Sequence, residues 1–151
     1  MAVTCIVYNT FKKKLLSLDN SIDFDDGATV LRAALLGSTY NPSPDTHAFF
    51  SDVATWEIPA TGNYVAGGEL VPDVTVGMDT SGDFAYVDAS VVTWTNVTLT
   101  ARYAVVYKDT GSAATSPLIG FVDFGADQLP SGVNFSIQWN PAAGGGMFSV
   151  V

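Results

Sequence analysis

The chain has 151 residues, enough for one domain that buries about 70% of the surface its unfolded form exposes. Hydrophobic residues make up 48% of it, charged residues only 14%, and the net charge is −9. Nucleic-acid binding depends on Lys and Arg displacing counterions from phosphates, so this balance predicts no DNA or RNA partner, and it disfavours anionic membrane surfaces for the same reason.

Residues 9–18 (NTFKKKLLSL) predict a short N-terminal helix. Asn9 can cap it. Three apolar side chains fall on one stripe at the spacing i, i+4, i+7: Phe11, Leu15 and Leu18. This is the one helix that the sequence predicts with a clear apolar face.

The expected helix also carries the basic cluster of the chain: Lys12, Lys13 and Lys14. A solvated helix face is the simple interpretation, and contact with an acidic surface of a partner subunit is the functional one. In a secretory signal, basic residues precede the apolar segment. Here the lysines follow the apolar residues of the N-terminus, so no secretory signal is predicted. No apolar segment approaches the roughly 18 residues that a membrane-spanning helix needs.

Residues 23–27 (DFDDG) bring three aspartates together before a glycine. A helix–loop–helix calcium site also needs a bidentate Glu at a fixed distance downstream, and none follows. We therefore expect a polar turn, with a calcium site shared between subunits as the alternative. The next run, residues 28–40 (ATVLRAALLGSTY), predicts a buried strand, although its Ala and Leu residues also suit a helix.

Pro42 and Pro44 forbid regular structure in the segment that follows. Asp45 or Thr46 is expected to cap one short helical turn through Val53. From there on, Gly- and Pro-rich turns separate short runs rich in Val, Thr and aromatic residues, and these predict strands. The runs are 69–76, 83–94, 97–109, 117–125, 133–139 and 147–151.

Alternation within residues 97–109 separates two faces of the expected strand. One parity is entirely apolar or aromatic: Val97, Leu99, Ala101, Tyr103, Val105 and Tyr107. Upstream, Val92 and Trp94 have the opposite parity, so the apolar face switches and a turn or bulge is expected at Thr95–Asn96. Arg102 and Lys108 then lie on the face opposite to the core. There, Arg102 pairs with an acid of the same sheet or with a carboxylate of a partner.

No residue pattern predicts catalysis. The one histidine, His47, lies in the Pro-flanked loop near Ser51 and Asp52, and is expected to face solvent or to cap, because a triad needs groups that converge from a scaffold. The acidic residues fall mostly in turns, whereas a carboxylate-based glycan hydrolase, which we keep as an alternative, needs a pair in a cleft. Cys5 is the sole cysteine and is expected to be a small buried side chain. We expect no cofactor and no metal.

A few aromatic side chains are candidates for surface contacts. Tyr40 and Tyr64 lie in expected loops, where aromatic side chains can anchor an interface. Tyr64 and Trp56 are also the side chains that would stack on a sugar.

Several stretches together resemble small virion structural proteins of tailed bacteriophages. They are VTCIVYNTFKKKLL, DTHAFFSDV, VTWTNVTLTARYAVVYKDTG, SPLIGFVDFG and FSIQWNPAAGGGMFSV. The resemblance implies a non-enzymatic protein of the virion, made in the host cytoplasm. It implies a capsid cement or decoration protein that oligomerises, as a dimer or trimer, and bridges major capsid protein subunits. The alternative is a tail or tail-fibre accessory that binds glycans.

The residues and the resemblance together predict a mainly β chain. We expect residues 1–151 to form one antiparallel β-sandwich or jelly-roll domain with one short N-terminal helix. The basic side chains are the candidates for contacts with partner proteins: Lys12, Lys13, Lys14, Arg102 and Lys108.

Overall fold

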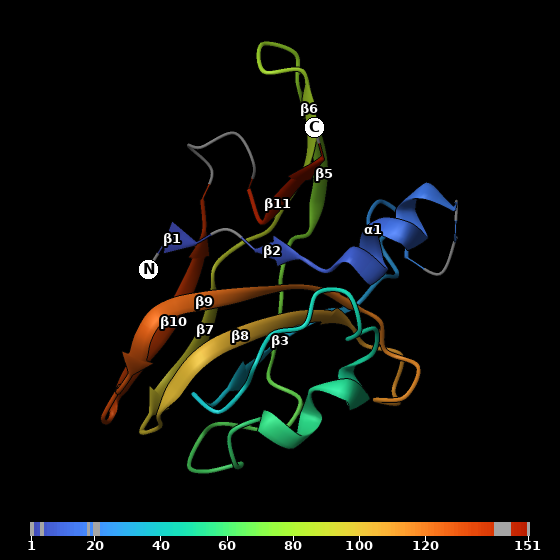
Figure 1. Ribbon diagram of the computed structural model, residues 1–151. Coiled ribbons are helices and arrows are strands. Elements are labelled where there is room, and N and C mark those ends of the chain that lie inside the picture. The colour runs from blue at the N-terminus through green and yellow to red at the C-terminus, as the bar shows by residue number, and fades with distance from the viewer. Residues whose placement is uncertain (1, 4, 18, 20–21, 141–145, 151) are drawn as a thin grey trace.

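The computed structural model describes residues 2–3, 5–17, 19, 22–140 and 146–150 (Figure 1). It is mainly β, as expected, and its described strands form three sheets with one α-helix beside them. In chain order the strands are β1 (Ala2–Val3), β2 (Ile6–Val7), β3 (Leu31–Leu36), β4 (Glu69–Leu70), β5 (Thr75–Asp79), β6 (Phe84–Asp88), β7 (Val92–Val97), β8 (Ala101–Lys108), β9 (Leu118–Gln128), β10 (Val133–Trp139) and β11 (Phe148–Val150). The helices are α1 (Asn9–Leu16) and two 3₁₀ turns, η1 (Phe50–Asp52) and η2 (Ala54–Trp56).

The largest sheet has the strand order β2-β9-β8-β3-β4, and its strands are antiparallel. β3 confirms the buried strand expected within residues 28–40. Four successive residues of β3, from Ala33 to Leu36, are fully buried. Both faces of the strand are therefore covered over these four residues, which explains why they are all apolar instead of alternating.

A second sheet has the order β1-β10-β7, with β10 antiparallel to β7 and parallel to β1. The bulge expected at Thr95–Asn96 is confirmed here. Trp94 and Val97 of β7 pair with Phe135 and Val133 of β10, so three steps on one strand match two on the other. Asn96 takes a φ of 49°, and its N–H donates to the side chain of Asn134 at 2.9 Å.

The prediction of one strand from Val97 to residue 109 is wrong. β7 ends at Val97 in one sheet and β8 begins at Ala101 in another, so residues 98–100 carry the chain between sheets. The prediction that one face of β8 is polar is also wrong beyond the first residues of the strand. Ala104 and Val106, which share the parity of Arg102, are fully buried. Like β3, β8 is covered on both faces.

Helix α1 begins and ends differently from the prediction. Its N-cap is Tyr8, and Asn9 lies inside the helix, where its side-chain amide donates to the carboxylate of Asp45 at 2.6 Å. Phe11 is buried and Leu15 is half-buried, as the apolar stripe predicts. Leu18, the third residue of that stripe, lies outside the described residues.

The Pro-flanked segment contains the expected helical turn, but the turn begins later. η1 starts at Phe50, and neither Asp45 nor Thr46 caps it. Asp52 holds the segment instead, because its carboxylate accepts the backbone N–H groups of Ala48 and Phe49 at 2.8 and 2.9 Å.

The third sheet has the order β11-β6-β5 and projects from the body of the molecule (Figure 1). We call this sheet, residues 75–88 and 148–150, the arm. The turn between β5 and β6 forms its tip, and α1 lies beside its base. Of the apolar residues of the arm, Val87 and Phe148 belong to the hydrophobic core, and both lie at its inner end.

Candidate interaction surface

One face of the arm consists of apolar side chains at every position. Residues that pair across antiparallel strands point to the same side of a sheet. The registers Val76↔Val87 and Met78↔Ala85 join β5 to β6, and Val87↔Phe148 and Ala85↔Val150 join β6 to β11. The apolar arm face is therefore Val76, Met78, Ala85, Val87, Phe148 and Val150.

The inner half of the apolar arm face is covered. Phe148 and Val87 are 2% and 6% exposed. The ring of Phe148 lies edge-on to Phe11 of α1 and to Phe24, each at a centroid distance of 5.7 Å, and those two rings contact each other at 6.0 Å. This aromatic triad joins the arm to the helix, since edge-to-face rings stabilise one another beyond the area they bury.

The outer half of the same face is open. Met78, Val150 and Val76 are 75%, 54% and 50% exposed. Three adjoining hollows of about 350, 350 and 170 Å³ all include Val150 in their walls and continue from the arm tip to Leu15 and Leu16 of α1. The uncovered side chains thus form one strip that runs from the helix to the tip.

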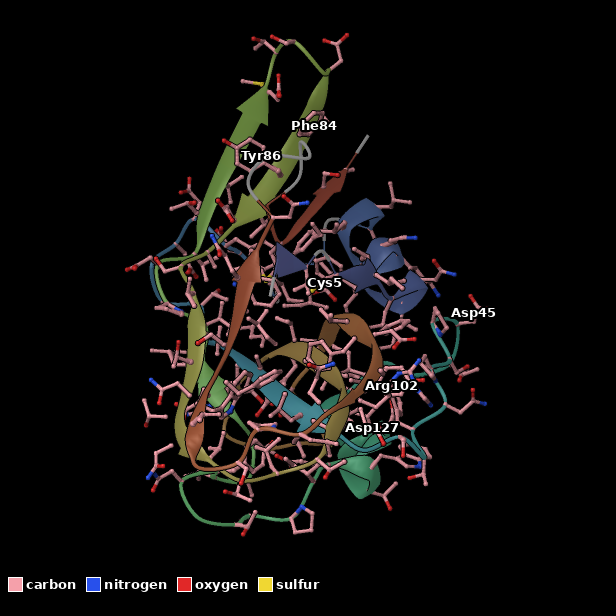
Figure 2. The ribbon with its side chains drawn as sticks, turned by 90° about the vertical axis from the view of Figure 1, so that its left-hand side faces the viewer. Cys5, Asp45, Phe84, Tyr86, Arg102 and Asp127 are labelled. Carbon is pink, nitrogen blue, oxygen red and sulfur yellow. The ribbon has the colours of Figure 1, made fainter. Side chains whose placement is uncertain are left out.

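The opposite face of the arm is closed by its own aromatic rings (Figure 2). A Cβ added at Gly77 would lie 2.4 Å from the ring of Tyr86, and one added at Gly82 would lie 2.3 Å from the ring of Phe84. Both rings therefore lie against glycines, and both are half-buried. This leaves the apolar arm face as the open side of the sheet.

Charges of opposite sign lie at the two ends of the open strip. The tip carries Asp79 and Asp83, and the arm contains no Lys or Arg. At the other end, Lys12 lines the same hollow as Leu16 and Val150. Among the described residues, Lys12 and Lys13 form no ion pair, whereas Lys14 pairs with Asp19 at 2.9 Å.

The predicted contact residues on β8 lie elsewhere on the molecule. Arg102 pairs within the chain, with Nε and Nη2 donating to the carboxylate of Asp123 on β9 at 2.7 and 3.3 Å. The hydrogen bond from Arg102 lowers the pKa of Asp123. The interpretation that Arg102 pairs with an acid of its own chain is thus confirmed. Lys108, near the charge of Asp26, is far along β8 from this pair.

Both tyrosines that were predicted as surface anchors are buried, so that prediction is wrong. Tyr40 and Tyr64 are 2% and 1% exposed. The O–H of Tyr64 donates to Glu57 at 2.8 Å and accepts the N–H of Leu35 at 3.0 Å, which fixes the loop onto β3. Loops that fold back over a sheet bury their aromatic residues, and local sequence does not reveal this. Trp56 is half-buried beside Tyr40.

The loop position suggested that His47 faces solvent, but its ring packs against other side chains. Its ring stacks on Tyr40 at 5.7 Å, and its Nδ1 lies 3.2 Å from the hydroxyl of that tyrosine. The Tyr40 hydroxyl also shares a hydrogen bond of 2.6 Å with that of Tyr8. Burial lowers the pKa of His47, with the charge of Asp52 acting in the opposite direction.

A polar hollow of about 460 Å³ lies between Arg32, Glu57, Tyr107 and Asp109. Burial raises the pKa of Glu57, although the O–H of Tyr64 and the N–H of Gly67 donate to its carboxylate at 2.8 and 2.6 Å. Arg32 is held by Asp109 at 2.7 Å and by the carbonyl of Gly68 at 3.1 Å. The groups that line this hollow therefore hold one another in place.

The Glu57→Gln variant is expected to lose part of the pH dependence of stability. A raised carboxyl pKa means that the folded protein takes up the proton first, so the wild-type free energy of unfolding gains a contribution as pH falls through the folded pKa of Glu57. Gln keeps the acceptor oxygen for Tyr64 and Gly67 but cannot titrate. Urea unfolding from about pH 7 to pH 4 checks this, and parallel profiles for the two proteins would contradict it.

The remaining predicted features are local. Asp23 accepts the N–H of Asp25, and Asp26 accepts two backbone N–H groups, so residues 23–27 form the expected polar turn. Within the described residues no group of three or more His, Cys, Asp or Glu side chains is arranged to hold a metal.

Cys5 is buried, as predicted, and burial raises the pKa of its thiol to about 12. No described helix is long and apolar enough to cross a membrane.

Sequence reasoning missed the apolar arm face itself. The signal was present, because Val76 and Met78 on one side of the turn and Ala85 and Val87 on the other alternate with polar or aromatic residues.

No protein-family model, curated protein or solved structure matches the chain. The geometry of this surface is therefore the main indication of function.

Proposed function

We propose that the chain is a structural protein of a bacteriophage virion, a non-enzymatic decoration protein that oligomerises and bridges major capsid protein subunits. The observation that carries the proposal is the arm, a projecting sheet whose apolar outer half is open. A short sheet with apolar side chains in water is marginally stable and prone to association, so this geometry suits a protein that is covered in an assembly.

The composition supports the same proposal. Charged residues are few, and large apolar side chains are exposed outside the arm as well, such as Val65 at 63% exposure. A shell component gains stability by burying such area on its neighbours. The net charge of −9 disfavours the packaged nucleic acid and supports contacts with proteins.

We also infer that the five-stranded sheet and the sheet β1-β10-β7 are the two layers of a β-sandwich. Their buried residues belong to one hydrophobic cluster that includes Trp94, Ile137 and Val105. At their edge, the rings of Phe124 on β9 and Phe135 on β10 meet edge-on at 5.5 Å. Small sandwiches of this kind are common modules of assembled shells.

Binding to capsids that lack the protein tests the function. The purified chain is expected to bind such capsids close to stoichiometrically and to raise the temperature at which they release their contents. The variant Met78→Asp is expected to weaken this effect, while Leu129→Asp, at a similarly exposed site, serves as its matched control.

Immunogold labelling of virions locates the protein independently. Label on the head is the expected result. Label on the tail, together with no binding to capsids, would contradict the decoration role and favour the alternative of a tail accessory protein.

A further inference from the structure

We infer that the apolar arm face binds the same face of a second copy of this chain. The two arms lie antiparallel about a two-fold axis, so that the tip of each arm reaches helix α1 of its partner. This inference deepens the proposed function by naming what covers the arm, and it rests on the premise that the arm is an assembly surface.

The first argument is the shape of the face. Its inner half is already one side of a layered packing, with Phe148 and Val87 buried under α1 and Phe24. Its outer half continues the same sheet with Val76, Met78 and Val150 uncovered. Sheets cover such a face best with another sheet, at a separation of about 10 Å. A second arm supplies a sheet of the right width and the same apolar pattern.

The second argument is charge. Asp79 and Asp83 lie at the tip, and Lys12 lines the hollow at the helix end of the strip, with Lys13 next to it in α1. An antiparallel pair places each acidic tip beside the partner's lysines, which creates two equivalent attractive contacts. A parallel pair would place like charges together. The strip is therefore complementary to itself in one orientation only.

The third argument is the absence of a competing face on the arm. Phe84 and Tyr86 close the opposite side by lying over Gly82 and Gly77. The two arginines are already paired within the chain, Arg32 with Asp109 and Arg102 with Asp123, each at 2.7 Å. Lys14 pairs with Asp19, so Lys12 and Lys13 of α1 remain as the partners for the tip.

Sedimentation equilibrium of the full chain tests the inference directly. The wild type is expected to form a dimer, and Met78→Asp and Val150→Asp are each expected to raise its dissociation constant at least about tenfold, because each places a charge in the apolar contact. Leu129→Asp, in the turn between β9 and β10 at the far end of the molecule from the arm, is expected to leave it unchanged (Figure 1). Circular dichroism confirms that each variant is folded.

A charge exchange tests the orientation. The double variant Lys12→Glu/Lys13→Glu is expected to weaken the dimer, since acidic groups then face the acidic tip. Adding Thr80→Lys and Ser81→Lys, both exposed at the tip, is expected to restore it. Failure of the tip lysines to restore a weakened dimer would overturn the antiparallel arrangement.

Two further results would overturn the dimer. One is a wild-type chain that sediments as a monomer at all concentrations, and the other is a dimer that Met78→Asp and Val150→Asp leave intact. A monomer that still binds capsids would remove this inference and the oligomerisation in the proposed function, but not the binding to capsids. A dimer that fails to bind capsids would remove the decoration role and leave this inference standing.

Discussion

Replacing Gly68 by alanine is expected to lower the free energy of unfolding by about 2–5 kcal/mol. Gly68 has a φ of 74°, where a residue with a Cβ costs about 1–2 kcal/mol. An added Cβ would also lie 1.9 Å from the carbonyl oxygen of Ala33 and 2.6 Å from the Cα of Ala34. Both atoms belong to the backbone of β3, which cannot move without disturbing the central sheet, so overpacking adds about 1–3 kcal/mol.

Gly111→Ala separates these two contributions. Gly111 has a similar φ of 84°, but nothing lies within 4 Å of the added Cβ. Its expected loss is only the backbone part, about 1–2 kcal/mol. Urea unfolding followed by tryptophan fluorescence measures both variants. Equal losses would show that the approach of Gly68 to β3 costs nothing.

Replacing Phe148 by alanine is expected to lower the free energy of unfolding by about 3–5 kcal/mol, the range for removing a large buried aromatic ring. Phe148 is 2% exposed and stands at the centre of the triad with Phe11 and Phe24. Its loss removes the contact that joins the arm to α1. Amide hydrogen exchange in β5 and β6 is therefore expected to accelerate more than exchange in β3.

Phe148→Leu is the matched control, since it keeps most of the buried volume and is expected to cost less than about 1.5 kcal/mol. Measurements at low protein concentration keep self-association from adding to the stability. If exchange in the arm and in β3 accelerates equally in Phe148→Ala, the arm unfolds together with the body, and the triad is not its separate anchor.

The features that the sequence predicted correctly are those with local causes. The buried strand at β3 follows from the apolar run from Ala33 to Leu36, and the bulge at Thr95–Asn96 follows from a switch of parity. The break between β7 and β8 was missed because Thr98, Leu99 and Thr100 continue the alternation while the chain changes sheets. Alternation of apolar and polar residues indicates which face of a strand is covered. It does not indicate which sheet covers that face.

Only part of the candidate surface could be predicted from the sequence, for the same reason. The lysines of α1 and the alternating residues of the arm are visible in the sequence. The boundary between the covered Val87 and the open Met78 depends on where α1 and Phe24 dock, which is a long-range contact. Tyr40 and Tyr64 show the opposite error, because the fold of their loops hides side chains that local pattern leaves exposed.

The triad of Phe11, Phe24 and Phe148 also affects the order in which the parts of the chain fold. It joins the first helix to β11, the last described strand in chain order, so it closes across a long sequence separation. Contacts of that kind form late, because chain closure is costly before they exist, and synthesis proceeds from the N-terminus. We therefore expect a growing chain to lack a finished arm until its body is made. Under the proposed function, the arm would become able to bind a partner only when folding is complete.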